Sequence, residues 1–444
     1  MHPTWRLQRL LHQFRHALAA PSRNPRTAVV IGRLLAAAFL LCFATGIYSH
    51  FIQDPLPGMA FLTRPVWLYQ VSQGIHISAG IVCFPLIFAK LYAVLPELFQ
   101  TPPIRSFPHF LERASIAIFV AASLVQITIG LLNTYQWYAL FPFPFRQTHF
   151  ALSFVVIGSL AIHIAVKLTT ISRYWRKKDS FDDNGDLVVY DEDPDAVFDQ
   201  PDELRRLTGK PMNSGITGRI FAWIDKEPEE TPPPGKATQK TAQQKAQTSR
   251  RGFFVTIGLV SAALVTFTAG QSFRLFDATN IFGPRKNDIG PQGLPVNRTA
   301  KAAKVLESAT STEWNLTVSN GDVTRVYSYQ QLLAMPQYEV ELPIACVEGW
   351  SQYAHWTGPR LSELVDSVGA ERGATVRITS LEQNSSYAVT EMQPEFVRDD
   401  LTLLALALNG ETLDIDHGYP ARIIAPARPG VLQTKWLSTL EVMA

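Results

Sequence analysis

The stretch Ala345-Cys346-Val347-Glu348-Gly349-Trp350-Ser351 holds the last of the three cysteines in the chain. The other two, Cys42 and Cys83, lie in long apolar runs, so the C-terminal part has no second cysteine for a disulfide within it. Cys346 is therefore either an inert buried side chain or a thiolate that does chemistry. The sequence on both sides of the stretch decides between these two interpretations.

The chain has 444 residues and a formal net charge of +2, but it divides into two unlike parts. Residues 31–170 are rich in long apolar runs, whereas residues 271–444 have the mixed composition of a globular domain. Three cysteines without a CxxC pair form neither a disulfide framework nor a zinc ribbon. The C-terminal part also lacks a basic stripe interleaved with aromatic residues, so no nucleic-acid partner is expected.

The N-terminal part has the pattern of a membrane protein. Residues 1–30 contain a basic amphipathic stretch, which predicts a cytoplasmic segment lying on the lipid surface. Four apolar runs of bilayer-spanning length follow, and Arg and Lys concentrate before the first, between the second and third, and after the fourth. By the positive-inside rule, both ends of an all-α four-helix domain at 31–172 lie in the cytoplasm. The four runs cover residues 31–50, 67–95, 114–132 and 148–170.

Three histidines lie within these runs. His76 in the second run and His149 in the fourth are predicted at the same depth, where two imidazoles can hold one haem iron. His163 follows His149 by 14 residues, which places it on the same helix face about 21 Å further along. That spacing suits a second haem iron. The alternative is that these histidines are only hydrogen-bonded between helices.

The segments Gly32-Arg33, Thr45-Gly46 and Ile75-His76-Ile77, together with His149 and His163, resemble the membrane cytochrome b subunits of formate dehydrogenases and hydrogenases. The resemblance covers residues 28–172 and implies haem b and a quinol or quinone partner. This family's other inner-haem ligand is a histidine early in the first span, where Arg33 stands here. The resemblance therefore supports one haem on His76 and His149, and leaves His163 without an evident partner.

Residues 173–249 predict a cytoplasmic linker that is first acidic and then rich in Pro and Gln, solvated and flexible. Docking of a basic partner on its acidic part is the alternative. Ser249-Arg250-Arg251-Gly252-Phe253 then opens a fifth apolar helix at 250–272 and resembles a twin-arginine export signal. The other interpretation is that the two arginines anchor the cytoplasmic end of this span. Both place residues 284–444 outside the cytoplasm on a multi-pass chain of the cell membrane, and the first adds the twin-arginine export machinery as a partner.

Residues 284–444 alternate between short strands and short helices, which predicts an α+β domain. The strand pattern is clearest at Glu313–Val318 and Thr375–Thr379, where apolar and polar residues alternate. A capped short helix is predicted from Ser328. Further helical stretches are expected at Leu361–Val365 and Leu401–Leu408.

Four segments in this domain resemble, in order and spacing, the sulfite oxidase family of molybdenum enzymes. They are Cys346–Ser351, Leu408–Leu413, His417–Arg422 and Lys435–Leu437. The resemblance implies a molybdenum ion on molybdopterin, with Cys346 as its one thiolate ligand from the protein. A soft thiolate suits a soft metal centre, and arginine and lysine supply the charge that a pterin phosphate requires. The cofactor-binding residues that the resemblance implies are Asn297, Arg298, Thr379, His417, Arg422, Gln433, Thr434 and Lys435.

The residues after Cys346 differ from the Asn-Arg-Arg-like run of typical sulfite oxidases and are closer to the bacterial methionine sulfoxide reductase catalytic subunit. Glu348 and Trp350 beside the metal disfavour a small dianion, so we predict that they belong to the catalytic site for a small-molecule oxo substrate. An anion pocket built by three other arginines is the alternative. These are Arg360, Arg398 and Arg428.

Together, the two parts predict a molybdopterin-dependent oxidoreductase for oxygen-atom transfer, in which haem b carries electrons between quinol and molybdenum. Reduction of an S-oxide or N-oxide is the first expectation. Sulfite-type oxidation that delivers electrons to quinone is the second. The third is a non-enzymatic haem module with a degenerate adaptor domain.

Overall fold

The computed structural model describes residues 20–99, 106–176, 236–383 and 385–443, together with Leu10, Leu11, Phe14, Leu18 and Ile104. Most of the predicted surface segment and the whole acidic loop at 179–203 lie outside these residues. The chain divides into two compact units, which are treated separately below. The first comprises Met1–Leu40, Gly80–Thr128 and Ala151–Ala263, and the second comprises Leu41–Ala79, Ile129–Phe150 and Leu264–Ala444.

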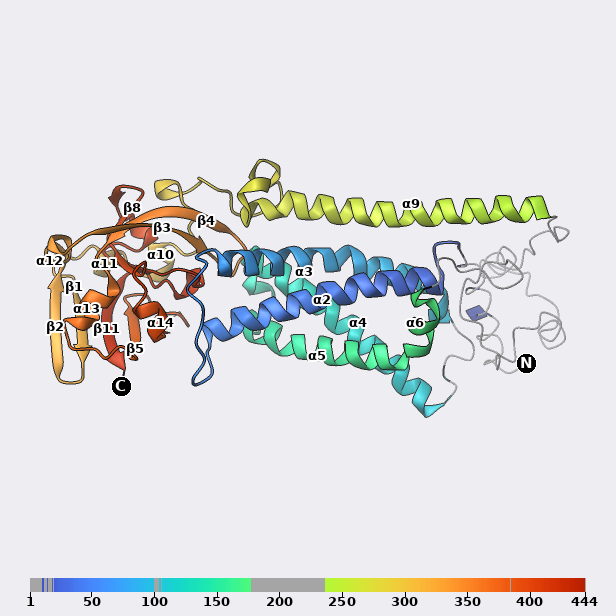
Figure 1. The fold of residues 1–444 in the computed structure, drawn as a ribbon, viewed down its shortest axis with the longest axis horizontal. Helices are drawn as coiled ribbons and strands as arrows, with labels where there is room; N and C mark the ends of the chain where they lie inside the picture. The colour runs from blue at the N-terminus through green and yellow to red at the C-terminus, as the bar shows by residue number, and fades with distance from the viewer. Residues whose placement is uncertain are drawn as a thin grey trace. The chain divides into compact units, whose positions relative to one another are not determined.

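Five helices in the described part of the chain are long and apolar enough to span a membrane (Figure 1). All five predicted runs are therefore confirmed as helices, although the boundaries differ by several residues. The fourth run ends earlier than expected, at Val166, and a separate short helix, α6 (Leu168–Trp175), follows it. The five are α2 (Pro25–Gln53), α3 (Leu68–Ala93), α4 (Phe107–Thr134), α5 (Phe145–Val166) and α9 (Lys236–Thr268).

One correction concerns the linker. Helix α9 begins at Lys236, so residues 236–249, which we expected to be flexible, are helical. The physical reason is their composition, because the segment is made largely of Ala, Gln and Lys, which all have high helix propensity. The Pro-rich residues 231–235, which precede it, lie outside the described residues.

In the first unit, parts of α2, α3, α4 and α5 pack against one another. Phe39 of α2 meets Phe119 of α4 with ring centroids 5.9 Å apart. Lys90 of α3 donates a hydrogen bond to the carbonyl of Ala28 at 2.7 Å. The Arg33 guanidinium lies 4.0 Å from the centre of the Trp175 ring.

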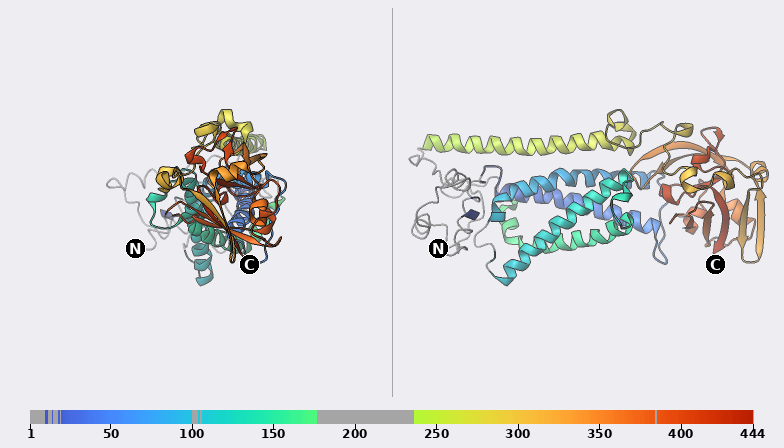
Figure 2. Two further views of the ribbon diagram at one scale, coloured as in Figure 1. Left: turned by 90° about the vertical axis from the view of Figure 1, so that its left-hand side faces the viewer. Right: turned by 180° about the vertical axis from the view of Figure 1, so that it is seen from behind.

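The second unit contains the α+β domain, drawn in yellow to red in Figures 1 and 2. Its main sheet has the strand order β2-β1-β11-β5-β6. Strand β1 pairs in parallel with β11, and the other neighbours are antiparallel. The strands are β1 (Asn315–Asn320), β2 (Val323–Ser328), β5 (Thr375–Ser380), β6 (Val389–Met392) and β11 (Leu437–Met443). The helices are α10 (Ala300–Ala303), α11 (Leu306–Ala309), α12 (Tyr329–Ala334), α13 (Leu361–Asp366) and α14 (Pro394–Val397). Helices α12, α13 and α14 share one buried apolar cluster with this sheet, whereas α10 and α11 contribute to a separate cluster around Trp436.

A second sheet, with the order β3-β4-β8-β9, carries the cysteine turn between its first two strands. Strands β7 and β10 form a separate antiparallel pair. The bounds are β3 (Tyr338–Ala345), β4 (Ser351–Gly358), β7 (Leu403–Ala405), β8 (Ala407–Leu408), β9 (Glu411–Thr412) and β10 (Arg422–Ile424). Short 3₁₀ helices occur in the connections of both units. They lie at Leu95–Phe99, Tyr138–Leu140, Ala269–Gln271, Arg274–Thr279, Pro291–Gly293, Ile415–His417 and Gly430–Leu432.

Most of the expected elements of this domain are confirmed. Strands form at both predicted places, and Ser328 caps α12 in a capping box with Gln331. The expected helix at Leu401–Leu408 is wrong, because this stretch forms β7 and β8. Its apolar side chains are buried all round, and a short, continuously apolar run does not distinguish a strand from a helix by periodicity.

Candidate active site

Cys346 opens the tight turn that joins β3 to β4. Its backbone N–H donates to the Trp350 carbonyl at 2.9 Å, and the Gly349 N–H donates to the Cys346 carbonyl at 3.0 Å. Gly349 has φ +101°, a conformation that glycine adopts without strain. The Cys346 side chain is only 1% exposed. The hairpin therefore holds one thiol at a defined, buried position.

The thiol is protonated in the absence of a metal. Burial, and after it the charge of Glu348, raise the pKa of Cys346 well above its usual range, although Arg285 and Lys435 oppose this shift. A metal ion would displace the proton and hold the sulfur as a thiolate. Among the described residues no group of three or more His, Cys, Asp or Glu side chains could hold a metal ion. A metal here would thus depend on Cys346 and on ligands from outside the protein.

Glu348 and Trp350, the two predicted site residues after the cysteine, contact each other. The Trp350 indole N–H donates to Oε2 of Glu348 at 3.3 Å, and the Gln136 amide donates to Oε1. An Arg285 nitrogen lies 3.9 Å from Oε2. Burial raises the pKa of Glu348, whereas the Gln136 hydrogen bond and the Arg285 charge lower it. Both oxygens of this 6% exposed residue are therefore engaged by partners from the protein.

Lys435 lies among three oxygen atoms. Its ammonium donates to Oδ1 of Asn297 at 3.2 Å, to the Arg298 carbonyl at 2.6 Å and to the Asp416 carbonyl at 2.9 Å. Burial, and after it the charge of Arg422, lower the pKa of Lys435 to about 7. The structure thus brings the predicted residues Asn297 and Arg298 to Lys435. The Arg298 side chain itself pairs with Glu382 at 3.2 Å.

Arg422 connects two further predicted residues. Its guanidinium donates to the carbonyls of His417 at 3.0 Å and Gln433 at 3.1 Å, and burial lowers its pKa to about 9. Burial also lowers the pKa of His417 to about 4, so its imidazole is neutral at pH 7. Gly418 lies between the two cations. A Cβ atom on Gly418 would be 3.0 Å from Cβ of Lys435 and 3.1 Å from Cβ of Arg422, so only glycine allows this approach.

The donor set fits an anionic cofactor. Arg422 and Arg428 are buried, Lys435 is partly buried, and no carboxylate among the described residues lies within ion-pair distance of any of the three. A buried cation without an anion is costly, so such a group of charges favours a negatively charged partner such as a pterin phosphate. Together with the single buried thiol, these residues match the needs of molybdenum on molybdopterin.

For two predicted residues, Thr434 and Thr379, the hydrogen bonds found among the described residues are to other partners than these cations. The Thr434 hydroxyl lies 2.9 Å from that of Thr390, and Thr379 accepts a hydrogen bond from Ser438 through its carbonyl. The neighbour of Thr379, Ser380, donates to the Lys435 carbonyl at 2.7 Å instead.

The three arginines suggested for an anion pocket are not equivalent. The Arg360 guanidinium lies 3.8 Å from Asp400, and Arg398 pairs with Asp366, whereas Arg428 is buried and donates to backbone carbonyls. Arg428 differs from the other two arginines in its burial, and no sequence pattern predicts this difference.

The histidine pair lies within the second unit. The ring centroids of His76 and His149 are 6.1 Å apart. Nδ1 of His76 lies 3.0 Å from the Cys42 carbonyl, which leaves Nε2 for another partner. A Cβ atom on Gly46 would lie 3.1 Å from the His76 ring, and one on Gly130 would lie 3.4 Å from the His149 ring. His163, in the first unit, stacks on Phe119 with centroids 5.7 Å apart.

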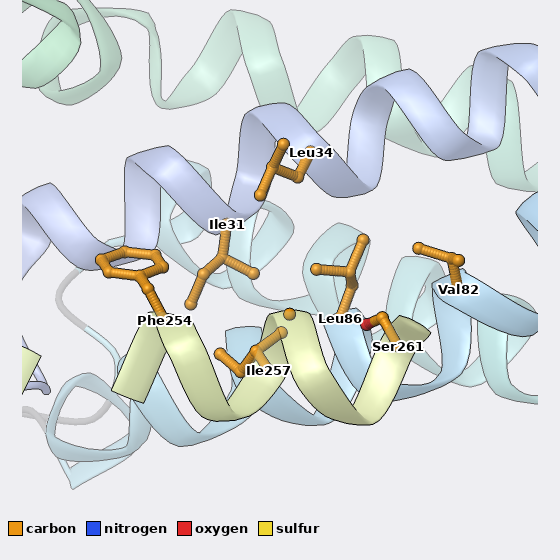
Figure 3. Close-up of a pocket in the computed structure, with 8 residues that line it drawn as sticks. Ile31, Leu34, Val82, Leu86, Phe254, Ile257 and Ser261 are labelled. Carbon is orange, nitrogen blue, oxygen red and sulfur yellow. The ribbon is translucent and has the colours of Figure 1, made fainter. Parts of the chain in front are cut away.

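The first unit also contains an apolar cavity of about 250 Å³ (Figure 3). The Ser261 hydroxyl is its one side-chain polar group, and no hydrogen-bond partner for it is found among the described residues. The cavity is lined by Ile31, Leu34, Val82, Leu86, Phe254, Ile257, Gly258 and Ser261.

Comparison with known proteins agrees with the chemistry of this site. Residues 302–444 match the family model described as oxidoreductase molybdopterin binding domain. An uncharacterized oxidoreductase, YuiH, of Bacillus subtilis is 31% identical over 29% of this chain and 65% of its own length. The protein-methionine-sulfoxide reductase catalytic subunit MsrP of Campylobacter jejuni is 22% identical over 45% and 74%. A sulfite oxidase of Arabidopsis thaliana is 28% identical over 26% and 38%.

The C-terminal part of the chain is therefore a molybdopterin-binding domain of the sulfite oxidase and MsrP type, and its class is oxidoreductase. The match begins after Asn297 and Arg298 and leaves out all five apolar helices. The chain also spans less than two thirds of the Bacillus and Arabidopsis relatives.

Proposed function

We propose that this chain is a membrane-bound molybdenum oxidoreductase that reduces an S-oxide, or alternatively an N-oxide, with electrons from quinol. The observation that carries the proposal is the buried thiol of Cys346 in the same domain as Arg422, Arg428 and Lys435, for which the described residues provide no carboxylate within ion-pair distance. When bound there, molybdenum on molybdopterin supplies two-electron oxygen-atom transfer. Oxidation of quinol to quinone releases two electrons and two protons. These convert the S-oxide to a thioether and water.

The chain's own residues hold the cofactor and limit the substrate. Cys346 is the thiolate ligand, and Lys435 and Arg422, with Asn297, Arg298, His417 and Gln433 around them, hold the anionic end of the pterin. Near the thiol, Arg285 is paired with Glu348, so its charge is already compensated. A site without an uncompensated cation next to the metal favours a neutral S-oxide over a dianion. The Campylobacter relative, named as a protein-methionine-sulfoxide reductase, supports the same substrate class.

Sulfite-type oxidation that delivers electrons to quinone is the second candidate. Arg428 favours it, because a buried arginine without a carboxylate partner can bind an anionic substrate as well as a cofactor phosphate. The Arabidopsis relative named as a sulfite oxidase is in agreement. A degenerate adaptor domain is the third candidate, and the intact set of Cys346, Arg422 and Lys435 argues against it.

Haem b bound between His76 and His149 is the second part of the proposal. The ring centroids of His76 and His149 are 6.1 Å apart, so the two imidazoles are near enough that both could hold one haem iron, which would supply one-electron transfer. Gly46 and Gly130 beside the rings provide the space that a flat macrocycle needs. A second haem on His163 has less support, because the ring contact of His163 is with Phe119 and Arg33 lies on Trp175.

The last part of the proposal concerns the membrane. The five apolar helices cross the lipid bilayer, with the N-terminus in the cytoplasm and residues 284–444 outside it, exported through the twin-arginine machinery. The cavity beside Ser261 has a size and an apolar lining that suit the hydrocarbon chain of a quinol or lipid.

The experiment that tests this function starts with molybdenum, pterin and haem analysis of the purified full-length protein. Turnover is then measured with a panel of a sulfoxide, an N-oxide and sulfite. We expect about one molybdenum and one haem b per chain, and quinol-supported reduction of the sulfoxide. Correctly inserted protein without molybdenum would overturn the proposal. Turnover of sulfite alone would replace it by the second candidate.

A further inference from the structure

The turn that carries Cys346 is held by side chains that precede residues 302–444, the part of the chain that matches the molybdopterin family. The Val347 carbonyl accepts a hydrogen bond from the Gln73 amide of α3 at 3.1 Å and another from the Asn133 amide of α4 at 3.4 Å. Two carboxamides from different helices thus converge on one backbone oxygen. This oxygen belongs to the residue directly after the thiol.

The next residue, Glu348, is held in the same way. Its carboxylate accepts from the amide of Gln136, which follows α4, and pairs with Arg285, which precedes the family-matched residues 302–444. Only Trp350 contributes a donor from within the turn itself. Because a buried carboxylate is costly without partners, these donors are needed to keep Glu348 in place.

The third residue of the turn completes the pattern. The Gly349 carbonyl accepts a hydrogen bond from the Ser272 hydroxyl. A Cβ atom on Gly349 would lie 2.9 Å from Cγ1 of Ile77, which shows how tightly α3 packs on the turn. Ile77 is the neighbour of His76 in the sequence.

All five donors precede residue 302, where the match to the molybdopterin family begins. We infer that Gln73, Asn133, Gln136, Ser272 and Arg285 form a latch, a set of positioning residues that fixes the Cys346 turn in the geometry needed to ligate the metal. The inference rests on the proposed function for the role of Cys346. It also assigns Glu348 a different role from the catalytic one expected from sequence. With both carboxylate oxygens engaged, Glu348 is the anchor of the latch.

The physical reason is that buried backbone carbonyls and carboxylates require hydrogen-bond partners. Three successive residues of the turn accept hydrogen bonds or an ion pair from segments outside the family-matched region, so that region does not by itself supply all the donors that its turn requires. A latch residue that is removed leaves a buried acceptor unpaired, and the turn then opens more often.

The test uses the full-length chain from cells grown without molybdenum, so that Cys346 is free to react. The measured quantity is the rate at which iodoacetamide alkylates Cys346, followed by mass spectrometry of the peptide that contains it. Loss of one hydrogen bond to a charged group makes opening about 10- to 100-fold more frequent. We therefore expect Gln136→Leu to raise the alkylation rate by about this factor.

Two further variants separate positioning from general destabilisation. Gln337→Leu is the matched control, because the Gln337 amide caps the end of α12 and does not contact the turn. It should leave the alkylation rate of Cys346 unchanged. The exchange Gln136→Glu with Glu348→Gln restores an amide–carboxylate pair in the reverse direction and should bring the rate back towards that of the wild type. In protein grown with molybdenum, the same exchange should restore dye-supported kcat lost in Gln136→Leu, with KM unchanged.

Equal alkylation rates of Cys346 in Gln136→Leu and in the wild type would overturn the latch. An exchange of Gln136→Glu with Glu348→Gln that leaves the alkylation rate as high as in Gln136→Leu would also overturn it. If Gln136→Leu does not accumulate in cells, Gln136→Asn, whose side chain is shorter by one methylene, replaces it. A raised alkylation rate of Cys346 would again support the latch, and an unchanged rate would overturn it. Absence of molybdenum from the wild type would overturn the proposed function, while the alkylation rates would still decide whether the latch exists.

Discussion

Replacing Gly418 by alanine tests whether Lys435 and Arg422 hold the cofactor. Gly418 has φ +115°, where an L residue is strained by about 1–3 kcal/mol. Its new methyl group would also lie 3.0 Å and 3.1 Å from the Cβ atoms of the two cations. Carbon atoms prefer separations of about 3.5–4.0 Å, so both cationic side chains must move by roughly half an ångström.

Gly410 provides the matched control. It also has a positive φ, +84°, but no atom lies within 4 Å of the position that a Cβ would take. Gly410→Ala therefore carries the backbone strain without the crowding. Overpacking of a buried site adds about 1–3 kcal/mol, so Gly418→Ala should be less stable than Gly410→Ala by that amount. For a domain of this size each kcal/mol lowers Tm by about 2–4 °C.

The assay is pterin and molybdenum content per chain, together with thermal unfolding followed by tryptophan fluorescence. We expect Gly410→Ala to unfold at a lower temperature than the wild type but to keep its cofactor. Gly418→Ala should lose most of the cofactor. Wild-type cofactor content in Gly418→Ala, or equal loss in both variants, would show that the cations around Gly418 do not bind the pterin.

Three further outcomes are expected. Cys346→Ser should abolish turnover and leave the haem spectrum intact, and unchanged turnover would contradict the assignment of the metal ligand. His149→Ala should remove the haem absorption band and quinol-supported turnover while artificial dyes still support activity, and a retained band would reject its pairing with His76. Because burial and Arg422 lower the pKa of Lys435 to about 7, its charge is present below pH 7 and lost above it. Sulfate should therefore bind cofactor-free protein up to about 100-fold more weakly at pH 9 than at pH 6, as measured by calorimetry. A flat profile would show that Lys435 does not bind the anion.

The helices were predictable because length and composition alone define a bilayer-spanning segment. Local pattern was also enough for the strand that begins at Asn315 and for the capping box at Ser328. It failed at Leu401–Leu408, where the side chains are buried on all sides and leave no periodicity. It also failed at residues 236–249, where a polar composition concealed good helix formers.

The cofactor-binding residues divide in the same way. Cys346, Arg422 and Lys435 are close to their motif neighbours along the chain, so the resemblance to the sulfite oxidase family already implied a thiolate ligand and phosphate-binding charges at these positions. The burial that distinguishes Arg428 from Arg360 and Arg398 was not predictable, because it depends on how the chain packs around the side chain.

The sequence alone determined the chemistry of this protein, namely one thiol, a set of cations, paired histidines and five apolar helices. Folding decided which groups meet. Gln136 and Glu348 are 212 residues apart in the sequence, and Asn133 and Val347 are 214 residues apart. No local pattern encodes such a contact, since it arises only when the helix ends and the β3–β4 turn come together and each buried acceptor requires a donor.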